Sequence, residues 1–195
     1  EIMRVRGLCP DATLHYNNPV RSTCEIQAGI QAGIASWSVD CISELEKLIE
    51  NRVAGEIAVR LHLPIGGSSY NFGEKFGACP DAAVKLLRRV AMAGYPTAMT
   101  FHVGTQCTDY SAWEEYISAC CDIALRANVS LTRVNVGGGF PAHRNSSVPD
   151  LSSLFGRILE AVNSTFSAKA PLLVCEPGRS MVSECYQLLV RVKGR

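Results

Sequence analysis

The stretch LTRVNVGGGFP, residues 131–141, places three consecutive glycines directly behind an apolar run that predicts a buried strand. Glycine inside an element costs stability, because it loses the most backbone freedom on folding and has no side chain to pack. Three together indicate either a tight turn or a backbone that approaches a ligand closely. No Gly-Lys-Ser or Gly-Lys-Thr follows, and Pro141 and Ala142 stand where a dinucleotide fingerprint needs glycine. The pattern therefore favours a phosphate of another kind.

The same alternation of a short apolar run and a helical pattern extends outward along the chain in both directions. The predicted strands are 12–16, 35–39, 56–63, 98–103, 131–136 and 171–175, and the predicted helices are 22–33, 41–52, 81–94, 111–127 and 150–166. Strands that are apolar on both faces and separated by helices indicate a parallel sheet covered by helices. The fold class is therefore α/β.

Residues at the expected helix ends agree with this pattern. Asp81 and Asp150 lie where N-caps are expected, and Pro80 precedes one helix. Gly33 and Gly94 lie where C-caps are expected.

An open doubly wound sheet and a barrel both fit the alternation, and the position of the polar residues distinguishes them. Such residues follow three of the predicted strands: His102 with Gly104, Gly137 to Gly139, and Glu176 with Gly178 and Arg179. In a TIM-type (β/α)8 barrel, catalytic groups come from the carboxyl ends of several strands, and a phosphate site commonly forms behind the last two. A closed barrel of this type has eight strands and roughly 250 residues. We therefore expect an incomplete TIM-type barrel, with two strands outside this chain.

Composition and charge exclude several classes of partner. The chain has 195 residues, is 47% hydrophobic, and carries 19 Lys plus Arg against 18 Asp plus Glu, which gives no basic stripe for nucleic acid and no pattern for a membrane surface. No apolar run is long enough to cross a bilayer, and the N-terminus has no signal-peptide core. The nine cysteines are scattered without a C-x-x-C pair, which indicates reduced thiols rather than disulfides or a zinc site. We expect a cytoplasmic protein.

Each polar or glycine-rich group that follows a predicted strand indicates a possible binding role by itself. The glycines at 137–139 offer backbone N–H groups to an anion, and Gly178 with Arg179 offers another N–H and a bidentate cation. Glu176 fits either a core ion pair with Arg179 or a partner for a cationic ring nitrogen. His102 fits either a satisfied core residue or an imidazole that lies flat on an aromatic ligand. Both alternatives stay open at this point.

Three motifs in series resemble a known family. FHVGTQC (101–107), NVGGGFP (135–141) and CEPGRSMV (175–182) are similar, in order and spacing, to the fold-type III pyridoxal-phosphate decarboxylases that act on ornithine, lysine, arginine and diaminopimelate. Earlier segments resemble the family too: YNNPV (16–20), SVDCISELEKL (38–48) and EKFG (74–77). The resemblance therefore covers residues 1–195. It implies that these residues form part of an alanine-racemase-like barrel domain that binds the cofactor. Phe140 and Pro141 are more similar to the ornithine or lysine/ornithine branch than to the diaminopimelate branch.

The resemblance implies pyridoxal 5'-phosphate as cofactor and a role for each matching residue. His102 would stack on the pyridine ring, Thr105 would lie near the cofactor, and Glu176 would pair with the ring nitrogen. The phosphate would be bound by Gly137, Gly138, Gly139, Gly178 and Arg179. Decarboxylation leaves a carbanion, and a protonated pyridinium held by a carboxylate is the electron sink that stabilises it. Asp40 matches a barrel aspartate whose role stays open.

The resemblance also implies parts that this chain lacks. The family's Schiff-base lysine stands in a Y-A-x-K-x-N type motif on an early strand, and that motif is absent here. None of the lysines present fits the position: Lys47, Lys75, Lys85, Lys169 and Lys193. The family's second, β-rich domain is absent as well. We therefore expect a partial chain that is poorly soluble and inactive by itself.

For the full-length protein, the resemblance implies decarboxylation of a small amino-acid substrate, ornithine or lysine, to a diamine in polyamine biosynthesis by a homodimer. Three other functions stay open. One is a non-catalytic homologue that acts as a regulatory protein-binding module, against which the retained Glu176 and Arg179 argue. Another is a diaminopimelate decarboxylase. The last is a pyridoxal-phosphate carrier or racemase-like barrel, and a carboxylate at the ring nitrogen disfavours racemase chemistry.

Overall fold

The computed structural model describes residues 1–65, 75–142, 149–166, 169–183, 185 and 187–192. One six-stranded sheet runs in the order β1-β2-β3-β4-β5-β6, and every neighbouring pair is parallel. The strands are β1 (Leu14–Tyr16), β2 (Ile34–Val39), β3 (Glu56–Arg60), β4 (Thr97–Thr100), β5 (Arg133–Asn135) and β6 (Leu172–Val174). All six predicted strands are confirmed.

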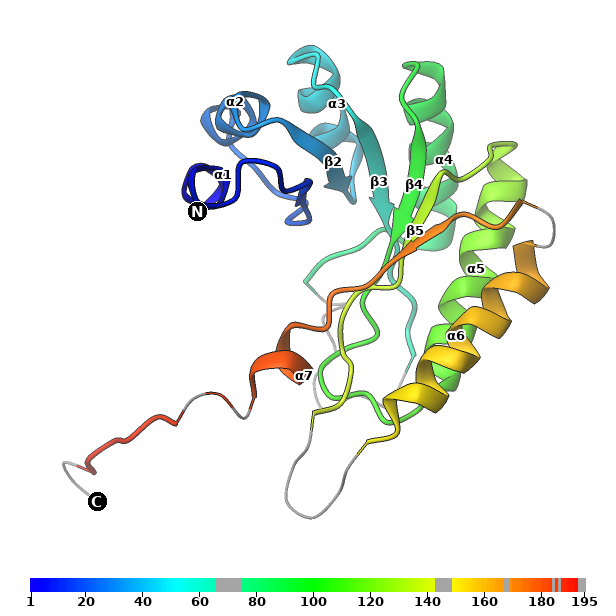
Figure 1. The fold of residues 1–195 in the computed structure, drawn as a ribbon. Helices are drawn as coiled ribbons and strands as arrows, with labels where there is room; N and C mark the ends of the chain where they lie inside the picture. Colours follow the sequence, from blue (N-terminus) through cyan, green and yellow to red (C-terminus); the bar gives the residue numbers. More distant parts are fainter. Residues whose placement is uncertain (66–74, 143–148, 167–168, 184, 186, 193–195) are drawn as a thin grey trace.

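The strand order distinguishes a barrel from a doubly wound sheet. A doubly wound sheet reverses its strand order at a switch point, whereas here each strand pairs with the next one along the chain. Right-handed crossovers between successive neighbours place all the connecting helices on one face of the sheet. Figure 1 shows this arrangement, a curled sheet with helices along its outer side. The incomplete TIM-type barrel is therefore confirmed, with β1 and β6 at the two ends of the sheet.

The helices are α1 (Ile2–Leu8), α2 (Thr23–Gln31), α3 (Ile42–Glu50), α4 (Pro80–Met92), α5 (Ser111–Ala127), α6 (Leu151–Phe166) and α7 (Gly178–Val182). The five predicted helices are confirmed. The sequence analysis missed α1 and α7, which are too short to show a helical period. Of the described helices, none combines the length and the apolar character that crossing a bilayer requires.

The helix ends confirm one predicted N-cap, correct the other, and shift the two C-caps by one residue. The C-caps are Ala32 and Ala93, and the predicted Gly33 and Gly94 follow them with positive φ. Asp150 caps α6 by accepting from the backbone N–H of Ser153 at 3.0 Å. The prediction for Asp81 is wrong, because Pro80 occupies the first helical position and Cys79 is the N-cap. Asp81 lies instead in the first turn, where its carboxylate contacts Arg126.

Aromatic residues next to the strand ends anchor the loops that follow. Phe101, directly after β4, stacks on Tyr116 of α5 with ring centroids 4.6 Å apart. Phe140, behind the glycines, stacks on Trp113 of α5 at 5.3 Å and contacts Phe155 of α6 at 5.1 Å. Phe101, Phe140 and Trp113 are at most 2% exposed. The loops at the carboxyl ends of β4 and β5 are therefore fixed to the helical layer.

The inner side of the sheet carries a charged layer toward the amino ends of the strands, where apolar strands were predicted. Glu56 accepts from the Arg133 guanidinium at 2.7 Å, from Ser36 at 2.9 Å and from Thr132 at 2.8 Å. Arg133 also contacts His15 Nε2 at 2.9 Å. One carboxylate and one guanidinium thus connect β1, β2, β3 and the start of β5. We call Glu56, Arg133, Ser36, Thr132 and His15 the floor cluster.

Candidate functional site

A cavity of about 240 Å³ lies at the carboxyl ends of β4, β5 and β6. It is lined by His102, Thr105, Gln106, Gly139, Phe140, Glu176, Gly178 and Arg179. Six of the eight predicted site residues are in this lining, and the other two, Gly137 and Gly138, belong to the turn that forms its wall. Residues that are far apart in the sequence are therefore brought to one place.

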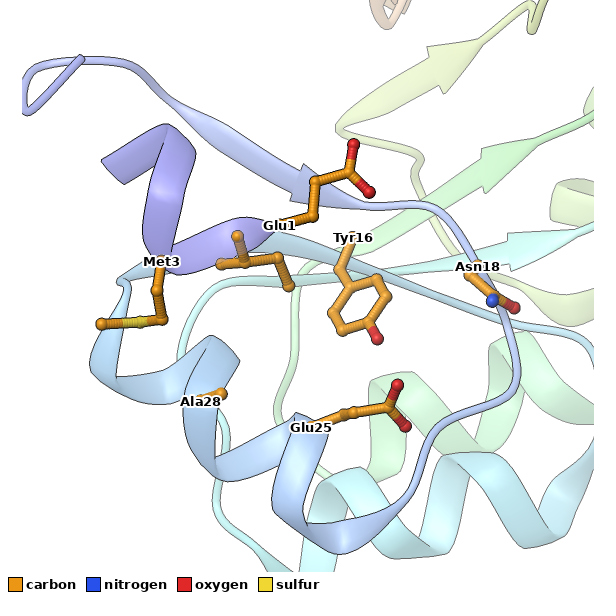
Figure 2. Close-up of a pocket in the computed structure, with 7 residues that line it drawn as sticks. Glu1, Met3, Tyr16, Asn18, Glu25 and Ala28 are labelled. Atoms are coloured by element: carbon orange, nitrogen blue, oxygen red, sulfur yellow. The ribbon is translucent and has the colours of Figure 1, made fainter. Parts of the chain in front are cut away.

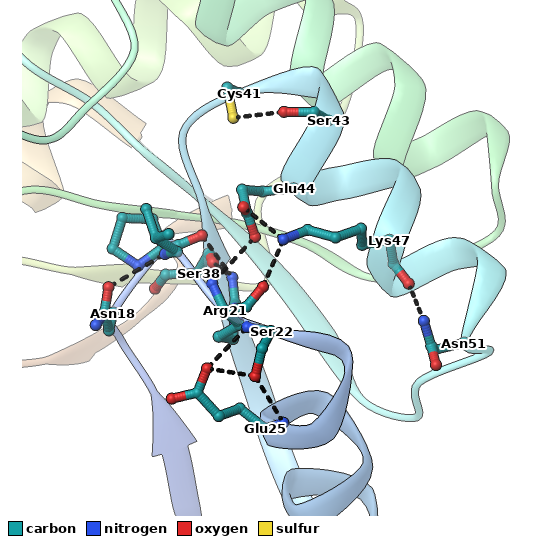
Figure 3. Close-up of polar contacts among 12 residues, drawn as sticks. Asn18, Arg21, Ser22, Glu25, Ser38, Cys41, Ser43, Glu44, Lys47 and Asn51 are labelled. Atoms are coloured by element: carbon teal, nitrogen blue, oxygen red, sulfur yellow. Dashed lines mark hydrogen bonds and ion pairs between the residues drawn. The ribbon is translucent and has the colours of Figure 1, made fainter.

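A larger cavity of about 390 Å³ lies elsewhere, beside α1, α2 and the edge strand β1 (Figure 2). Its lining includes Glu1, Tyr16 and Glu25 but none of the predicted site residues. Glu25 is already engaged, because its carboxylate accepts from the backbone and the hydroxyl of Ser22 in the capping box of α2 (Figure 3). The smaller cavity is the one with convergent chemistry.

The three glycines are required first by the packing of neighbouring loops. A Cβ on Gly137, whose φ is +67°, would lie 1.9 Å from the carbonyl oxygen of Phe101. A Cβ on Gly139, whose φ is +93°, would lie 2.2 Å from the carbonyl oxygen of Gly104. A Cβ on Gly138 would lie 2.8 Å from the carbonyl oxygen of Glu176. The turn after β5 is thus wedged between the backbones that follow β4 and β6.

Two of the predicted phosphate donors already have partners within the protein. The Gly137 N–H donates to Asn135 Oδ1 at 2.9 Å, and the Gly178 N–H donates to the Glu176 carbonyl at 2.8 Å. In the part of the chain that the structure describes, the N–H groups of Gly138 and Gly139 donate to no other group, and Arg179 is exposed without an ion pair. These free donors on a concave wall are what a bound phosphate requires.

Glu176 lies at the end of β6 and is held by a residue that the sequence analysis missed. Its Oε1 accepts from Asn135 Nδ2 at 2.7 Å, and no ion pair with Arg179 is found among the described residues. Asn135 is the last residue of β5 and is 6% exposed. A polar residue that ends an apolar strand directly before the glycines is the signal that would have found it.

His102 is held as a neutral imidazole. Its Nδ1 accepts from the Gly104 N–H at 3.0 Å, so the ring proton of the neutral form is on Nε2. Burial and, secondly, the positive charge of Arg60 lower the pKa of His102 to about 4. A neutral ring at pH 7 does not repel a protonated pyridine.

Arg60 and Asp40 complete the charges that face the site. Arg60 ends β3, and its guanidinium lies 5.1 Å from the centroid of the Phe76 ring. Burial lowers the pKa of Arg60, while the carboxylates of Glu176 and Asp40 oppose that shift. Asp40 also accepts from the Gly77 N–H at 3.1 Å, which gives this aspartate a role in ordering the loop before α4. Arg60 was missed, although a charge inside the apolar run 56–63 marks it.

The described lysines lie away from the cavity, and none of them is in its lining. Lys47 of α3 bonds to Glu44 at 2.6 Å and to the carbonyl of Arg21 (Figure 3). Lys75 lies 5.1 Å from the Phe76 ring centroid and is exposed. Lys193, which the sequence analysis also considered, lies outside the described residues.

The fold is an α/β barrel sheet with sequential parallel strands. N–H donors, an arginine and a carboxylate around one cavity at its carboxyl edge form a candidate anion-binding site. The family model for the pyridoxal-binding domain of pyridoxal-dependent decarboxylases matches residues 1–183. The chain belongs to this family, and its cofactor is pyridoxal phosphate.

Relatives of known function agree. The chain is 28% identical over 186 residues to the ornithine decarboxylase of Panagrellus redivivus, which covers 92% of this chain and 43% of that protein. It is 25% identical over 197 residues to antizyme inhibitor 2 of Xenopus laevis, covering 98% of this chain and 43% of that protein. The chain thus spans about half the length of the curated relatives it matches.

Solved structures give the same family. Lysine/ornithine decarboxylase from Vibrio vulnificus, complexed with putrescine, superimposes with a TM-score of 0.76 at 26% identity. The match covers 92% of this chain and 47% of that one. SrLDC in complex with PLP and cadaverine gives a TM-score of 0.77 at 25% identity, covering 92% of this chain and 46% of that one.

Proposed function

We propose that the protein carrying this chain is a cytoplasmic decarboxylase of a basic amino acid, ornithine or lysine, and that it forms a diamine for polyamine biosynthesis as a homodimer. The observation that carries the proposal is the cavity lined by Glu176, Arg179 and Gly139. The N–H groups of Gly138 and Gly139, in the turn at its wall, donate to no other group among the described residues. Residues 1–195 would act as the cofactor-binding domain. The cofactor-anchoring lysine would come from a part of the protein outside these residues.

Some residues of the cavity would bind the cofactor phosphate, and others would act on the cofactor ring during the reaction. Arg179 and the N–H groups of Gly138 and Gly139 would hold the phosphate, with Thr105 beside it. Pyridoxal phosphate, when bound, supplies a ring that accepts the electron pair left by the departing carbon dioxide. Glu176 would keep a proton on the ring nitrogen, and neutral His102 would lie against the ring. The buried Phe140 would exclude water from this side of the cavity.

The substrate class is supported by the relatives and by one local feature. Ornithine decarboxylase and lysine/ornithine decarboxylase are among the proteins that the chain resembles. Phe140 and Pro141, behind the glycines, match the ornithine or lysine/ornithine branch better than the diaminopimelate branch. We therefore place ornithine and lysine before arginine and diaminopimelate as substrates to assay.

The test is release of labelled carbon dioxide from carboxyl-labelled ornithine and lysine by the purified natural gene product. Arg179→Ala is expected to weaken pyridoxal-phosphate binding by about 1.5–3 kcal/mol, because a charge-assisted contact to the phosphate is lost. Glu176→Ala is expected to lower kcat more than it lowers cofactor affinity. Arg88→Ala, on the exposed face of α4, is the matched control and should change neither.

Normal turnover by Glu176→Ala would contradict the electron-sink role of this residue. The similarity to antizyme inhibitor 2 supports one competing function, a regulatory binding protein without catalysis. A gene product that binds pyridoxal phosphate but releases no carbon dioxide from ornithine, lysine, arginine or diaminopimelate would favour that alternative.

A further inference from the structure

Asn135 links two of the loops that form the cavity. Its Oδ1 accepts from the backbone N–H of Gly137 at 2.9 Å, and its Nδ2 donates to Glu176 Oε1 at 2.7 Å. The residue ends β5 and is 6% exposed. One buried amide therefore holds both the glycine turn after β5 and the carboxylate after β6.

The orientation of this amide follows from its partners. A backbone N–H can only donate, so the atom that faces Gly137 must be the oxygen, Oδ1. The atom that faces Glu176 is then the NH2 group, which can only donate. Glu176 Oε1 must accept, and Asn135 has no basic atom that could take a proton from the carboxyl group. The hydrogen bond therefore fixes Glu176 Oε1 as an acceptor and sets the orientation of the carboxylate.

We propose that Asn135 is a positioning residue that holds Glu176 as an ionised acceptor and leaves its second oxygen for the ring nitrogen of pyridoxal phosphate. The inference rests on the proposed function for the role of Glu176. A carboxylate oxygen that is held toward the ring nitrogen as an acceptor favours a proton on that nitrogen. Asn135 would therefore set how much of the bound cofactor is in the pyridinium form.

If only the hydrogen bond to Gly137 were important, Asn135 would have a purely structural role. A substitution that keeps this hydrogen bond and removes the one to Glu176 tests that alternative. A serine hydroxyl can accept from the N–H two residues further along, as asparagine does here. The serine hydroxyl is one bond closer to the backbone than the asparagine Nδ2, so it does not reach Glu176. Asn135→Ser therefore keeps an acceptor for the turn and removes the donor to the carboxylate, whereas Asn135→Ala removes both.

The experiment loads the natural gene product with pyridoxal phosphate that carries ¹⁵N at the ring nitrogen. The ¹⁵N chemical shift distinguishes a pyridinium from a neutral pyridine without any measurement of turnover. We expect a pyridinium signal in the wild type and a displacement toward neutral pyridine in both Asn135 variants. The dissociation constant of the cofactor should rise about tenfold, which corresponds to about 1.4 kcal/mol.

Thr97→Val is the matched control. Thr97 is 5% exposed and donates to the Ser130 carbonyl at 2.9 Å, at the opposite end of β4 from the cavity. Its loss removes a buried hydrogen bond of similar size and should leave the ¹⁵N signal and the affinity unchanged.

The outcomes separate the inference from the proposed function. A wild-type signal and affinity in Asn135→Ser overturns the role of Asn135 and leaves the decarboxylase proposal standing. A neutral pyridine in the wild type overturns the roles of both Asn135 and Glu176, whereas the decarboxylase proposal is still decided by the release of carbon dioxide. A wild-type protein that binds no pyridoxal phosphate overturns the proposed function, and the inference falls with it. If Asn135→Ala does not fold, as judged by its thermal unfolding, Asn135→Ser decides alone.

Discussion

Gly137 and Gly178 were both predicted from the sequence to bind cofactor phosphate, yet their N–H groups donate within the protein and their surroundings differ. Gly137 has a φ of +67°, and a Cβ there would lie 1.9 Å from a backbone oxygen, whereas a Cβ on Gly178 would meet nothing within 4 Å. Gly137→Ala should lower the free energy of unfolding by at least about 2 kcal/mol, since a left-handed alanine costs roughly 1–2 kcal/mol before the clash is added. Gly178→Ala should change it by less than about 0.5 kcal/mol.

Urea unfolding of both variants without cofactor measures this difference. Equal stability of the two variants would mean that the loop after β4 yields easily, and that the glycines are retained for the ligand alone. The sequence analysis explained residues 137–139 by phosphate contact, but the close approach of the loops after β4 and β6 could not be inferred from one strand end.

His102 should make the stability of the cofactor-free protein depend on pH. Its pKa is 6.5 in an ordinary setting and about 4 in the folded protein, mainly because of burial. Between these values the unfolded chain binds more protons, so the free energy of unfolding falls as the pH drops from 6.5 to 4 and is flat above 6.5. The loss attributable to His102 should reach about 3 kcal/mol or less.

Urea unfolding at pH 7.5 and pH 4.5, compared with His102→Gln, isolates this contribution. Glutamine can still accept from the Gly104 N–H but does not titrate, and the remaining histidines cancel in the difference. Identical pH dependence in the two proteins would mean that His102 is solvated and already protonates near its ordinary pKa.

At the scale of elements, the floor cluster joins strands that are distant in sequence. The Glu56 and Arg133 side chains are 11% and 18% exposed, and His15 and Ser36 also contact this pair. Glu56→Gln should destabilise the fold by about 3 kcal/mol, because it leaves the guanidinium of Arg133 largely buried without its counter-charge. Thermal or urea unfolding measures the effect.

The matched control is Glu46→Gln on the outer helical layer. Glu46 pairs with Arg89 at 2.7 Å, but these side chains are 37% and 34% exposed, so the expected loss is about 0–1 kcal/mol. A loss at Glu56 no larger than at Glu46 would show that the floor cluster is hydrated and contributes no more than a surface ion pair.

The elements themselves were largely predictable, whereas their inner contacts were not. Hydrophobic periodicity identified all six strands and the five long helices, because each buries an apolar face. The barrel was inferred from chemistry at the strand ends, and the strand order confirms it. Glu56 and Arg133 lie in strands that were predicted to be apolar. Their pairing across 77 residues could not be predicted, because it depends on the sheet register. Asn135 was missed for the same reason, because its partner belongs to another strand end.

At the scale of the whole molecule, the 195-residue chain presents apolar surface that a monomer in water does not retain. Residues 187–192, drawn in red in Figure 1, lie away from the sheet, and Leu188, Leu189 and Val190 are 88%, 93% and 78% exposed. β1 and β6 are also edge strands of the described sheet. Exposed apolar side chains and unpaired strand edges both favour association.

The chain expressed by itself should therefore elute in size-exclusion chromatography above the 21.1 kDa of its monomer, increasingly so at higher concentration. Leu188→Ser combined with Val190→Ser should shift it toward the monomer, because two of the most exposed apolar side chains of the segment are removed. Leu125→Ser, which removes a single exposed leucine from α5, is the control and should leave the elution unchanged. A monomer at every concentration would mean that this segment folds back and buries its own apolar side chains.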